Sequence, residues 1–281
     1  MGIDGLEDVS DLAPVEQTAF LTQYARALDS RWARPILGDT LADDVVGTID
    51  YDFAGLGVSS SVVCQTALRA KMIDDRVRSF ISAHPDAVVV DLGAGLDCGV
   101  YRVDPPASVD WYSVDLPDVV ALRDRVLPGR PRSHSVGVSL AEKRWPETIP
   151  ADRPTILIAD GLLAFLREEV IVDLFRGITD HFGSGELAFN DYGGIGWFSH
   201  AAIKLLPQKM FHDVGSQWGY AGFKDAHHPE TWSPRLRLVE EASLTKAPEV
   251  DLFPGWLRAA TRLTGMTKTG ARKARILRYR F

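Results

Sequence analysis

The stretch from Val88 to Asp97, VVVDLGAGLD, decides how this chain folds. Its first five residues, VVVDL, form a short β-branched run, which is typical of a strand buried on both faces of a sheet. Gly93 and Gly95 follow directly, so the backbone can turn sharply and approach a ligand without a Cβ in the way. The stretch therefore predicts the first strand of a parallel sheet, followed by a nucleoside-binding turn.

Further strands alternate with helices along the chain. The strand candidates are Trp111–Leu116 (WYSVDL), His134–Leu140 (HSVGVSL), Thr155–Ala159 (TILIA) and Glu186–Asn190 (ELAFN). The clearest helix follows TILIA, with Val170, Ile171, Leu174, Phe175 and Ile178 on one stripe. Two more helices are expected earlier, over Pro14–Leu28 and Ala67–Ile81. This alternation predicts an α/β fold with a doubly wound, mostly parallel sheet.

The carboxyl-terminal part predicts two closing strands, Arg235–Glu240 and Ala274–Phe281. The second places Leu277, Tyr279 and Phe281 on one face and its arginines on the other. We expect an antiparallel pair at the edge of the sheet, with the basic tail as an edge strand whose arginines oppose aggregation. The irregular segment from Gly193 to Pro234 is expected to help build a substrate pocket.

Composition narrows the classes of partner. The chain has 281 residues, 46% of them hydrophobic, and a formal net charge of -7, which argues against nucleic acid or anionic membrane as a partner. Cys64 and Cys98 are too few for a disulfide scaffold or a structural zinc site, and the amino terminus does not resemble a signal peptide. We expect a cytoplasmic protein with a small-molecule partner and no metal; the oligomeric state is left open.

The acidic residues around the turn favour one cofactor over another. Asp115 lies about twenty residues after the glycines, where a carboxylate can accept hydrogen bonds from ribose hydroxyls. A dinucleotide fingerprint would need a third glycine that is displaced here to Gly99, and Asp97 would repel a pyrophosphate. The ammonium and sulfonium groups of S-adenosylmethionine would be favoured beside Asp91 and Asp97. A nicotinamide cofactor remains the alternative.

These residues and several other segments resemble the leucine carboxyl methyltransferases and the related bacterial polyketide O-methyltransferases of the tetracenomycin type. The matching segments are DLGAGLD with Tyr101 and Arg102, WYSVDLPDVVALRDRVLP, QYARALDSRWARPILGD, IDYDF at Ile49–Phe53, LRAKMIDDRVRSFI, SLAEKRW at Ser139–Trp145 and ADGLLAFL at Ala159–Leu166. The resemblance covers essentially the whole chain and implies a Rossmann-like class I methyltransferase fold. It implies one domain, with a helical lid over 1–85, a cofactor-binding core over 86–192 and a substrate-side insertion with closing strands over 193–281.

The resemblance also assigns cofactor residues by position. Gly93 and Gly95 would border the methionyl part of S-adenosylmethionine, Asp115 would take the ribose, and Ser139 with Leu140 would lie along the adenine. Arg69 would pair with the methionyl carboxylate, and Asp160 would lie close to the methionyl group. Leu116, next to Asp115, is also expected to bind the cofactor. Departures from the family pattern are Cys98-Gly99 after GLD, where the family often has Thr-Arg, and DGLLAFL in place of EGVLMYL. Both departures affect the expected contacts with the methyl acceptor and leave the cofactor assignment unchanged.

Other candidate residues have structural interpretations. His200 and His212 are expected to be structural rather than general bases, and His227 and His228 to be exposed or capping residues rather than metal ligands. Cys98 is expected to be a buried filler. The tryptophans Trp197, Trp218 and Trp232 fit either substrate stacking or a core.

The sequence therefore predicts an S-adenosylmethionine-dependent O-methyltransferase acting on a carboxylate or phenolic hydroxyl of a small, polyketide-like metabolite. No catalytic residue is assigned, because no base motif stands out. This slightly favours a carboxylate acceptor, which is already ionised at neutral pH. The alternatives are an NAD-dependent oxidoreductase and a methyltransferase-like domain without methyl-transfer activity.

Overall fold

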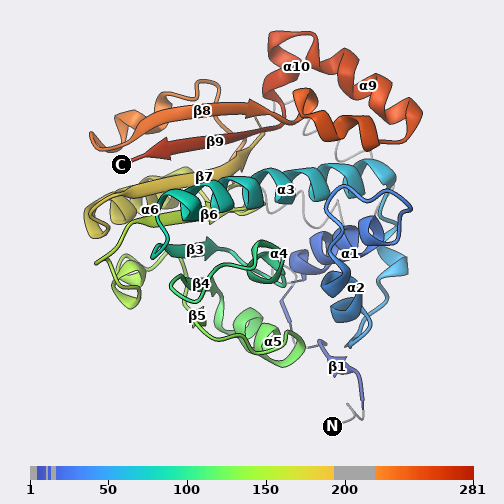
Figure 1. Cartoon of the computed structure of the whole chain (residues 1–281), viewed down its shortest axis with the longest axis horizontal. Helices are drawn as coiled ribbons and strands as arrows, with labels where there is room; N and C mark the ends of the chain where they lie inside the picture. Colours follow the sequence, from blue (N-terminus) through green and yellow to red (C-terminus); the bar gives the residue numbers. More distant parts are fainter. Residues whose placement is uncertain (1–4, 11, 14–16, 193–218) are drawn as a thin grey trace.

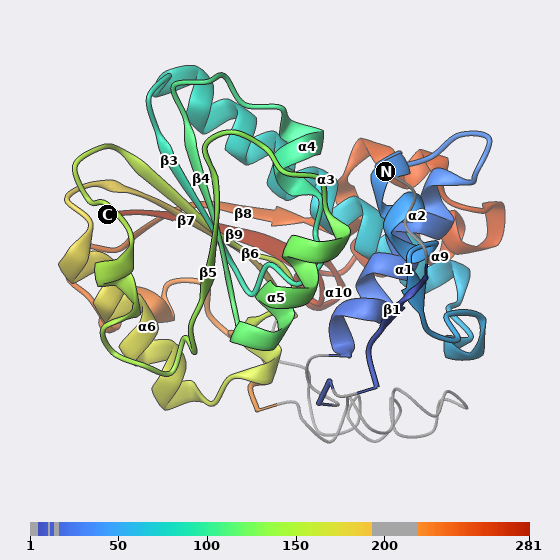
Figure 2. The same ribbon diagram turned by 90° about the horizontal axis from the view of Figure 1, so that it is seen from below.

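One seven-stranded sheet forms the centre of the molecule (Figures 1 and 2). The computed structural model describes residues 5–10, 12–13, 17–192 and 219–281. The strands are β3 (Val88–Leu92), β4 (Asp110–Asp115), β5 (Ser133–Gly137), β6 (Thr155–Ala159), β7 (Gly185–Asp191), β8 (Arg237–Ser243) and β9 (Arg275–Arg280). Their order across the sheet is β5-β4-β3-β6-β7-β9-β8. The predicted α/β class is confirmed.

The strand VVVDL lies in the middle of the parallel part. β3 pairs in parallel with β4 on one side and with β6 on the other, and all five of its residues are buried. β5 and β7 extend the parallel part outward. Because parallel strands end at the same edge of a sheet, the residues that follow β3, β4, β5, β6 and β7 lie side by side.

The two late strands form the predicted antiparallel pair, but in a different order. β9 lies between β7 and β8 and is antiparallel to both, so the edge strand is β8 and the last strand is internal. The expectation that the basic tail is an edge strand is therefore wrong. Its arginines have cross-strand partners instead: Arg278 pairs with Glu186 and Glu240, and Arg280 pairs with Glu186.

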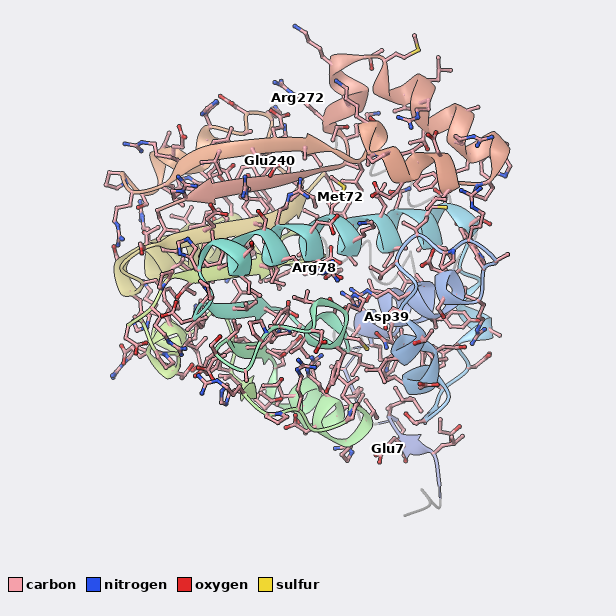
Figure 3. The ribbon with its side chains drawn as sticks, in the orientation of Figure 1. Glu7, Asp39, Met72, Arg78, Glu240 and Arg272 are labelled. Atoms are coloured by element: carbon pink, nitrogen blue, oxygen red, sulfur yellow. The ribbon has the colours of Figure 1, made fainter. Side chains whose placement is uncertain are left out.

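Helices cover the two faces of the sheet with separate cores. α3 (Ser60–Ala83) packs through its apolar stripe, which includes Leu68, Met72 and Val77, against β6, β7 and β9. Met72 points from α3 towards the β8–β9 pair (Figure 3). α6 (Glu168–His181) covers the other face with Ile171, Phe175 and neighbouring residues. Both helices were predicted; α3 begins seven residues earlier than expected.

The amino-terminal part lies beside the carboxyl ends of the parallel strands. It consists of β1 (Glu7–Asp8), α1 (Thr18–Ser30), α2 (Thr40–Val46), β2 (Ile49–Asp50) and η1 (Ala54–Leu56). Phe20 on α1 packs against Tyr51 and Phe53 in a third core. The predicted start of the first helix at Pro14 lies outside the described residues. α3, which falls in the expected lid over 1–85, packs along the sheet; that division stays a prediction.

Short elements complete the fold. They are α4 (Gly99–Val103), α5 (Pro117–Val126), η2 (Trp145–Thr148), η3 (Leu163–Phe165), η4 (His228–Thr231), η5 (Leu244–Lys246), η6 (Pro248–Leu252), α9 (Gly255–Gly265) and α10 (Lys268–Arg272). α9 and α10 lie over the first turns of α3 (Figure 1). Within the described part of the chain, every helix is too short or too polar to cross a membrane.

Candidate functional site

A cavity of about 790 Å³ opens at the carboxyl ends of the parallel strands. Its walls come from the turn after β3, the ends of β4 and β6, the residues after β5 and β7, and one side of α1 and α3. This is the edge where ligands bind in open α/β sheets. The volume is in the range of pockets that enclose a cofactor together with a small substrate.

The glycine turn forms one wall of this cavity. Gly93 and Gly95 have left-handed backbone angles, with φ of 65° and 49°. A Cβ on Gly93 would lie 2.8 Å from Leu162 Cδ1, and one on Gly95 would lie 3.1 Å from Ala19 Cβ on α1. Glycine is therefore required here both by backbone conformation and by the close approach of neighbouring segments.

Asp115 holds the turn from the end of the neighbouring strand. Its carboxylate accepts hydrogen bonds from the backbone N–H of Gly95 at 2.7 Å and from that of Leu116 at 2.7 Å. A carboxylate oxygen can accept more than one hydrogen bond, so holding the turn does not by itself prevent Asp115 from binding a ligand hydroxyl. The opposite side of the turn is held by Arg123, which donates to the carbonyl oxygens of Gly95 and Asp97.

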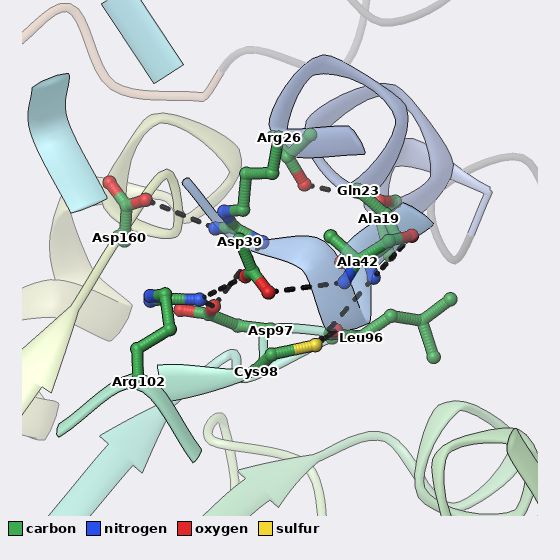
Figure 4. Close-up of polar contacts among 12 residues, drawn as sticks. Ala19, Gln23, Arg26, Asp39, Ala42, Leu96, Asp97, Cys98, Arg102 and Asp160 are labelled. Carbon is green, nitrogen blue, oxygen red and sulfur yellow. Dashed lines mark hydrogen bonds and ion pairs between the residues drawn. The ribbon is translucent and has the colours of Figure 1, made fainter. Parts of the chain in front are cut away.

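A buried ion cluster ties α1 to the turn (Figure 4). Arg26 on α1 lies 3.5 Å from Asp97 and 3.3 Å from Asp160. Arg102 on α4 also pairs with Asp97, at 2.5 Å, and with Asp39 and Asp74. Burial alone would raise the pKa of Asp97, but the two guanidinium groups outweigh it and hold that pKa below its usual range. Asp97 therefore has its charge already neutralised by protein groups.

Arg69 and Asp160 form a second pair across the cavity wall. Arg69 Nε lies 2.5 Å from Asp160 Oδ1, and a terminal nitrogen of Arg69 donates to the Tyr192 hydroxyl at 2.7 Å. These contacts leave N–H donors on the guanidinium that can still receive a carboxylate. Tyr192 follows β7 directly, so it reaches the site from the same edge as the other residues.

Asp91 is the least compensated charge in the cavity wall. Its Oδ2 is buried and has no hydrogen-bond partner among the described residues. Burial, reinforced by the nearby carboxylate of Asp97, raises its pKa well above the usual value. A buried carboxylate without a partner is a site for a cation, since a positive charge would both ionise it and satisfy its free oxygen.

All ten residues predicted to bind the cofactor line this cavity: Arg69, Asp91, Gly93, Gly95, Asp97, Asp115, Leu116, Ser139, Leu140 and Asp160. Contact with a cofactor stays a prediction for each of them. Of the two aspartates expected beside the cofactor's positive groups, Asp97 is paired with Arg26 and Arg102, whereas Asp91 Oδ2 has no hydrogen-bond partner among the described residues. Arg26, Arg123 and Tyr192 were not among the residues predicted to bind the cofactor, although Arg26 was expected on a helix that closes over the site. Of these, only Tyr192 carries a local signal, since it directly follows a parallel strand.

The remaining candidates have structural surroundings. Cys98 is fully buried, and burial raises the pKa of its thiol to about 12, so it is a filler rather than a nucleophile. Trp232 packs against Phe175 and Phe223 in the core under α6. His227 is exposed and pairs with Glu230. His200, His212, Trp197 and Trp218 lie outside the described residues, and the rest of the chain holds no cluster of three or more metal-ligating side chains.

The fold resembles that of solved methyltransferases. The fold matches a putative methyltransferase from Thermobifida fusca with a TM-score of 0.53 at 17% identity, over 91% of this chain and 93% of that one. It matches the plantazolicin methyltransferase BpumL, solved with a substrate analogue and S-adenosylhomocysteine, with a TM-score of 0.50 at 8% identity, over 94% and 98%. At these identities the likeness defines the fold: a class I methyltransferase.

Sequence comparison narrows the class to a family. The family model for leucine carboxyl methyltransferases matches residues 19–179. The tetracenomycin polyketide synthesis O-methyltransferase TcmP of Streptomyces glaucescens is 33% identical over 96% of this chain and 98% of that protein. The S-adenosyl-L-methionine-dependent methyltransferase dpfgK of Gibberella zeae is 27% identical over 82% of each.

The chain belongs to the leucine carboxyl methyltransferase family. The resemblance seen in the sequence is confirmed. So is the predicted cofactor class, because this is a family of S-adenosylmethionine-dependent methyltransferases.

Proposed function

We propose that this protein transfers the methyl group of S-adenosylmethionine to an oxygen, preferably a carboxylate oxygen, of a small polyketide-like acid. The observation that carries the cofactor side is the unpartnered carboxylate of Asp91 beside a glycine turn held by Asp115. The α-ammonium group of the cofactor supplies the positive charge that Asp91 lacks. Arg69 receives the methionyl carboxylate, Asp115 the ribose hydroxyls, and Leu116, Ser139 and Leu140 surround the adenine.

The wall of the first cavity provides few groups that could take a proton from an acceptor. Among its described residues the titratable ones are Arg26, Arg69, Asp91, Asp97, Asp115, Asp160 and Tyr192. The aspartates are engaged or deeply buried, and this part of the wall contributes no histidine or lysine. A carboxylate acceptor needs no base, since it is ionised at neutral pH, and guanidinium groups suit it as anchors.

The residues then act by positioning. When bound, S-adenosylmethionine supplies a methyl group activated by its sulfonium centre. The protein has to hold the acceptor oxygen in line, exclude water and keep the aspartates from competing for the methyl group. The ion pairs of Asp97 with Arg102 and of Asp160 with Arg69 serve that last purpose, because a paired, buried carboxylate is a poor nucleophile.

Calorimetric titration with S-adenosylmethionine, S-adenosylhomocysteine and NAD tests the cofactor side. We expect the first two to bind in the micromolar range and NAD not to bind. Asp115→Ala should abolish binding, whereas Asp118→Ala, an exposed position three residues on, should not. Binding of NAD alone would favour the oxidoreductase alternative.

The nature of the acceptor oxygen is tested by the product. With a radiolabelled methyl donor and a panel of aromatic acids and phenols, a methyl ester releases its label as methanol in mild alkali, whereas a phenol ether does not. We expect alkali-labile label. Normal cofactor binding with no transfer to any member of the panel would favour the domain without methyl-transfer activity.

A further inference from the structure

A second cavity adjoins the first on the other side of α3. It has a volume of about 270 Å³ and is lined by residues of the first turns of α3 and of the segment made of η5, α9 and α10. Most of its lining is apolar, with Leu68, Phe253 and Leu257 among the contributors. The proposed methyl transfer makes no use of this space.

The wall between the two cavities is thin. Ser61 and Gln65 line both of them, and they lie one helical turn apart on the same face of α3. Gln65 donates from its side-chain nitrogen to the Ser61 hydroxyl at 3.0 Å, and Gln65 is exposed. Two polar, partly solvated side chains from one helix can change rotamer without moving the backbone. A ligand in the first cavity can therefore extend past them into the second.

The second cavity carries one kind of charge. Lys273 is the charged residue among its described lining, and its ammonium group has no ion pair with any described residue. The neighbouring basic residues are engaged: Arg272 pairs with Glu241, and Arg275 with Asp191 and Glu241. The sequence from Leu252 to Phe281 contains eight lysines and arginines and no aspartate or glutamate. The end of this space is therefore suited to an anion.

We propose that the second cavity is a subsite for the distal end of an elongated acceptor, with an apolar body along α9 and a terminal carboxylate at Lys273. This inference rests on the proposed function, because the group to be methylated is placed in the first cavity. It adds a chemical requirement: a preferred acceptor has a second anionic group, separated from the methylated one by an apolar spacer that passes Ser61 and Gln65.

Matched synthetic ligands test the subsite. The probes are benzoic acids with a para alkyl chain of increasing length that ends in a carboxylate or, in the matched series, in a primary amide. Binding is measured by calorimetry in the presence of S-adenosylhomocysteine, and methyl transfer is measured separately. Above a threshold length, we expect the carboxylate series to bind about two- to fivefold more tightly than the amide series, because Lys273 is exposed.

Two pairs of variants locate the effect. Lys273→Glu should remove the preference for the carboxylate end, whereas Lys268→Glu, an exposed lysine on α10 outside the lining, should keep it. Ala260→Trp should fill the cavity and remove the advantage of long chains. Ala259→Trp is the control, because it adds the same side chain at the adjacent exposed position of α9, outside the lining.

The outcomes separate this inference from the proposed function. Equal binding of the two series, or equal losses in Lys273→Glu and Lys268→Glu, would overturn the subsite. Methyl transfer without any preference for length or charge would leave the proposed function standing and remove the subsite. A Lys273-dependent preference in binding without methyl transfer would support the subsite and contradict the proposed function.

Discussion

A single buried carboxylate, Asp91, links cofactor binding to pH. Because its pKa in the folded, cofactor-free protein is raised, the folded state holds its proton more tightly than the unfolded chain does. Its contribution to stability is therefore lost as pH rises from the ordinary aspartate range towards the raised value. Asp91→Asn removes this effect, so the variant should be more thermally stable than the parent, with a difference that grows as pH rises from the ordinary aspartate range towards the raised pKa.

The same substitution should weaken the cofactor. A cation needs the ionised form of Asp91, so in the parent the affinity for S-adenosylhomocysteine should fall with falling pH. In Asp91→Asn it should be lower by roughly 10- to 100-fold at neutral pH and nearly independent of pH. Asp86→Asn, at an exposed position before the same strand, should show neither change. Equal pH dependence in Asp91→Asn and the parent would contradict the role given to Asp91.

The glycine turn gives a second prediction at this scale. Gly95→Ala places a Cβ in a left-handed conformation and 3.1 Å from Ala19, which should lower stability by about 1–2 kcal/mol. Cofactor affinity should fall as well, because the turn and α1 must move apart. Gly129→Ala is the control, since a Cβ there meets nothing within 4 Å and its φ is not left-handed. Thermal unfolding and calorimetry measure the two effects.

Among the elements, α1 is held to the site by a charged side chain rather than by its apolar face alone. Arg26 reaches Asp97 and Asp160, which belong to two different strand ends. Arg26→Gln should therefore speed hydrogen exchange over residues 18–30 and lower the free energy of unfolding by about 2 kcal/mol. Arg31→Gln removes only a half-exposed pair with Asp43 and should change it by less than about 1 kcal/mol.

If α1 closes over bound cofactor, hydrogen exchange in α1 should also respond to the ligand. S-adenosylhomocysteine should slow exchange over residues 18–30 in the parent protein and much less in Arg26→Gln. Identical exchange with and without the ligand in the parent would rule out a closing role for α1.

For the whole molecule, Arg275 joins three segments that are distant in sequence. It is fully buried, pairs with Asp191 at the end of β7 and with Glu241 on β8, and donates to the Phe223 carbonyl oxygen. Arg275→Leu removes the buried ion pair with Asp191 and the contacts with Glu241 and Phe223, and should lower the free energy of unfolding by about 3–5 kcal/mol. Arg280→Leu on the same strand, largely exposed, should have a small effect; denaturant unfolding compares the two.

The parts of this molecule that could be predicted from sequence are those set by local pattern. VVVDL and TILIA are β-branched runs without polar alternation, so both their strand character and their central positions followed from composition. The order of β8 and β9 could not be predicted, because the alternation of β9 fits an edge or an internal strand equally well. The pairing of β9 with both β7 and β8 distinguishes the two, and Arg278 bridges them through Glu186 and Glu240.

The same division holds in the site. Gly93, Gly95 and Asp115 could be recognised because the strand–turn–strand spacing is local. The pairing of Arg26 with Asp97 depends on where α1 is placed by the packing of Phe20 on Tyr51 and Phe53, far along the chain. No sequence spacing carries that information, so the pairing of Asp97 with Arg26 could not be predicted.

The acid-free carboxyl-terminal stretch also affects how fast an acceptor arrives. The rest of the chain carries all 38 acidic residues, and several arginines of this stretch are paired with them. Arg258, Lys268 and Lys273 have no ion pair with a described residue, so they attract an approaching anion towards α9 and α10. The encounter rate of a dianionic acceptor should therefore fall more steeply with ionic strength than that of its monoamide, even where the bound complexes have equal lifetimes. Electrostatic guidance to one side of α3 would then select acceptors before any contact inside the cavities is made.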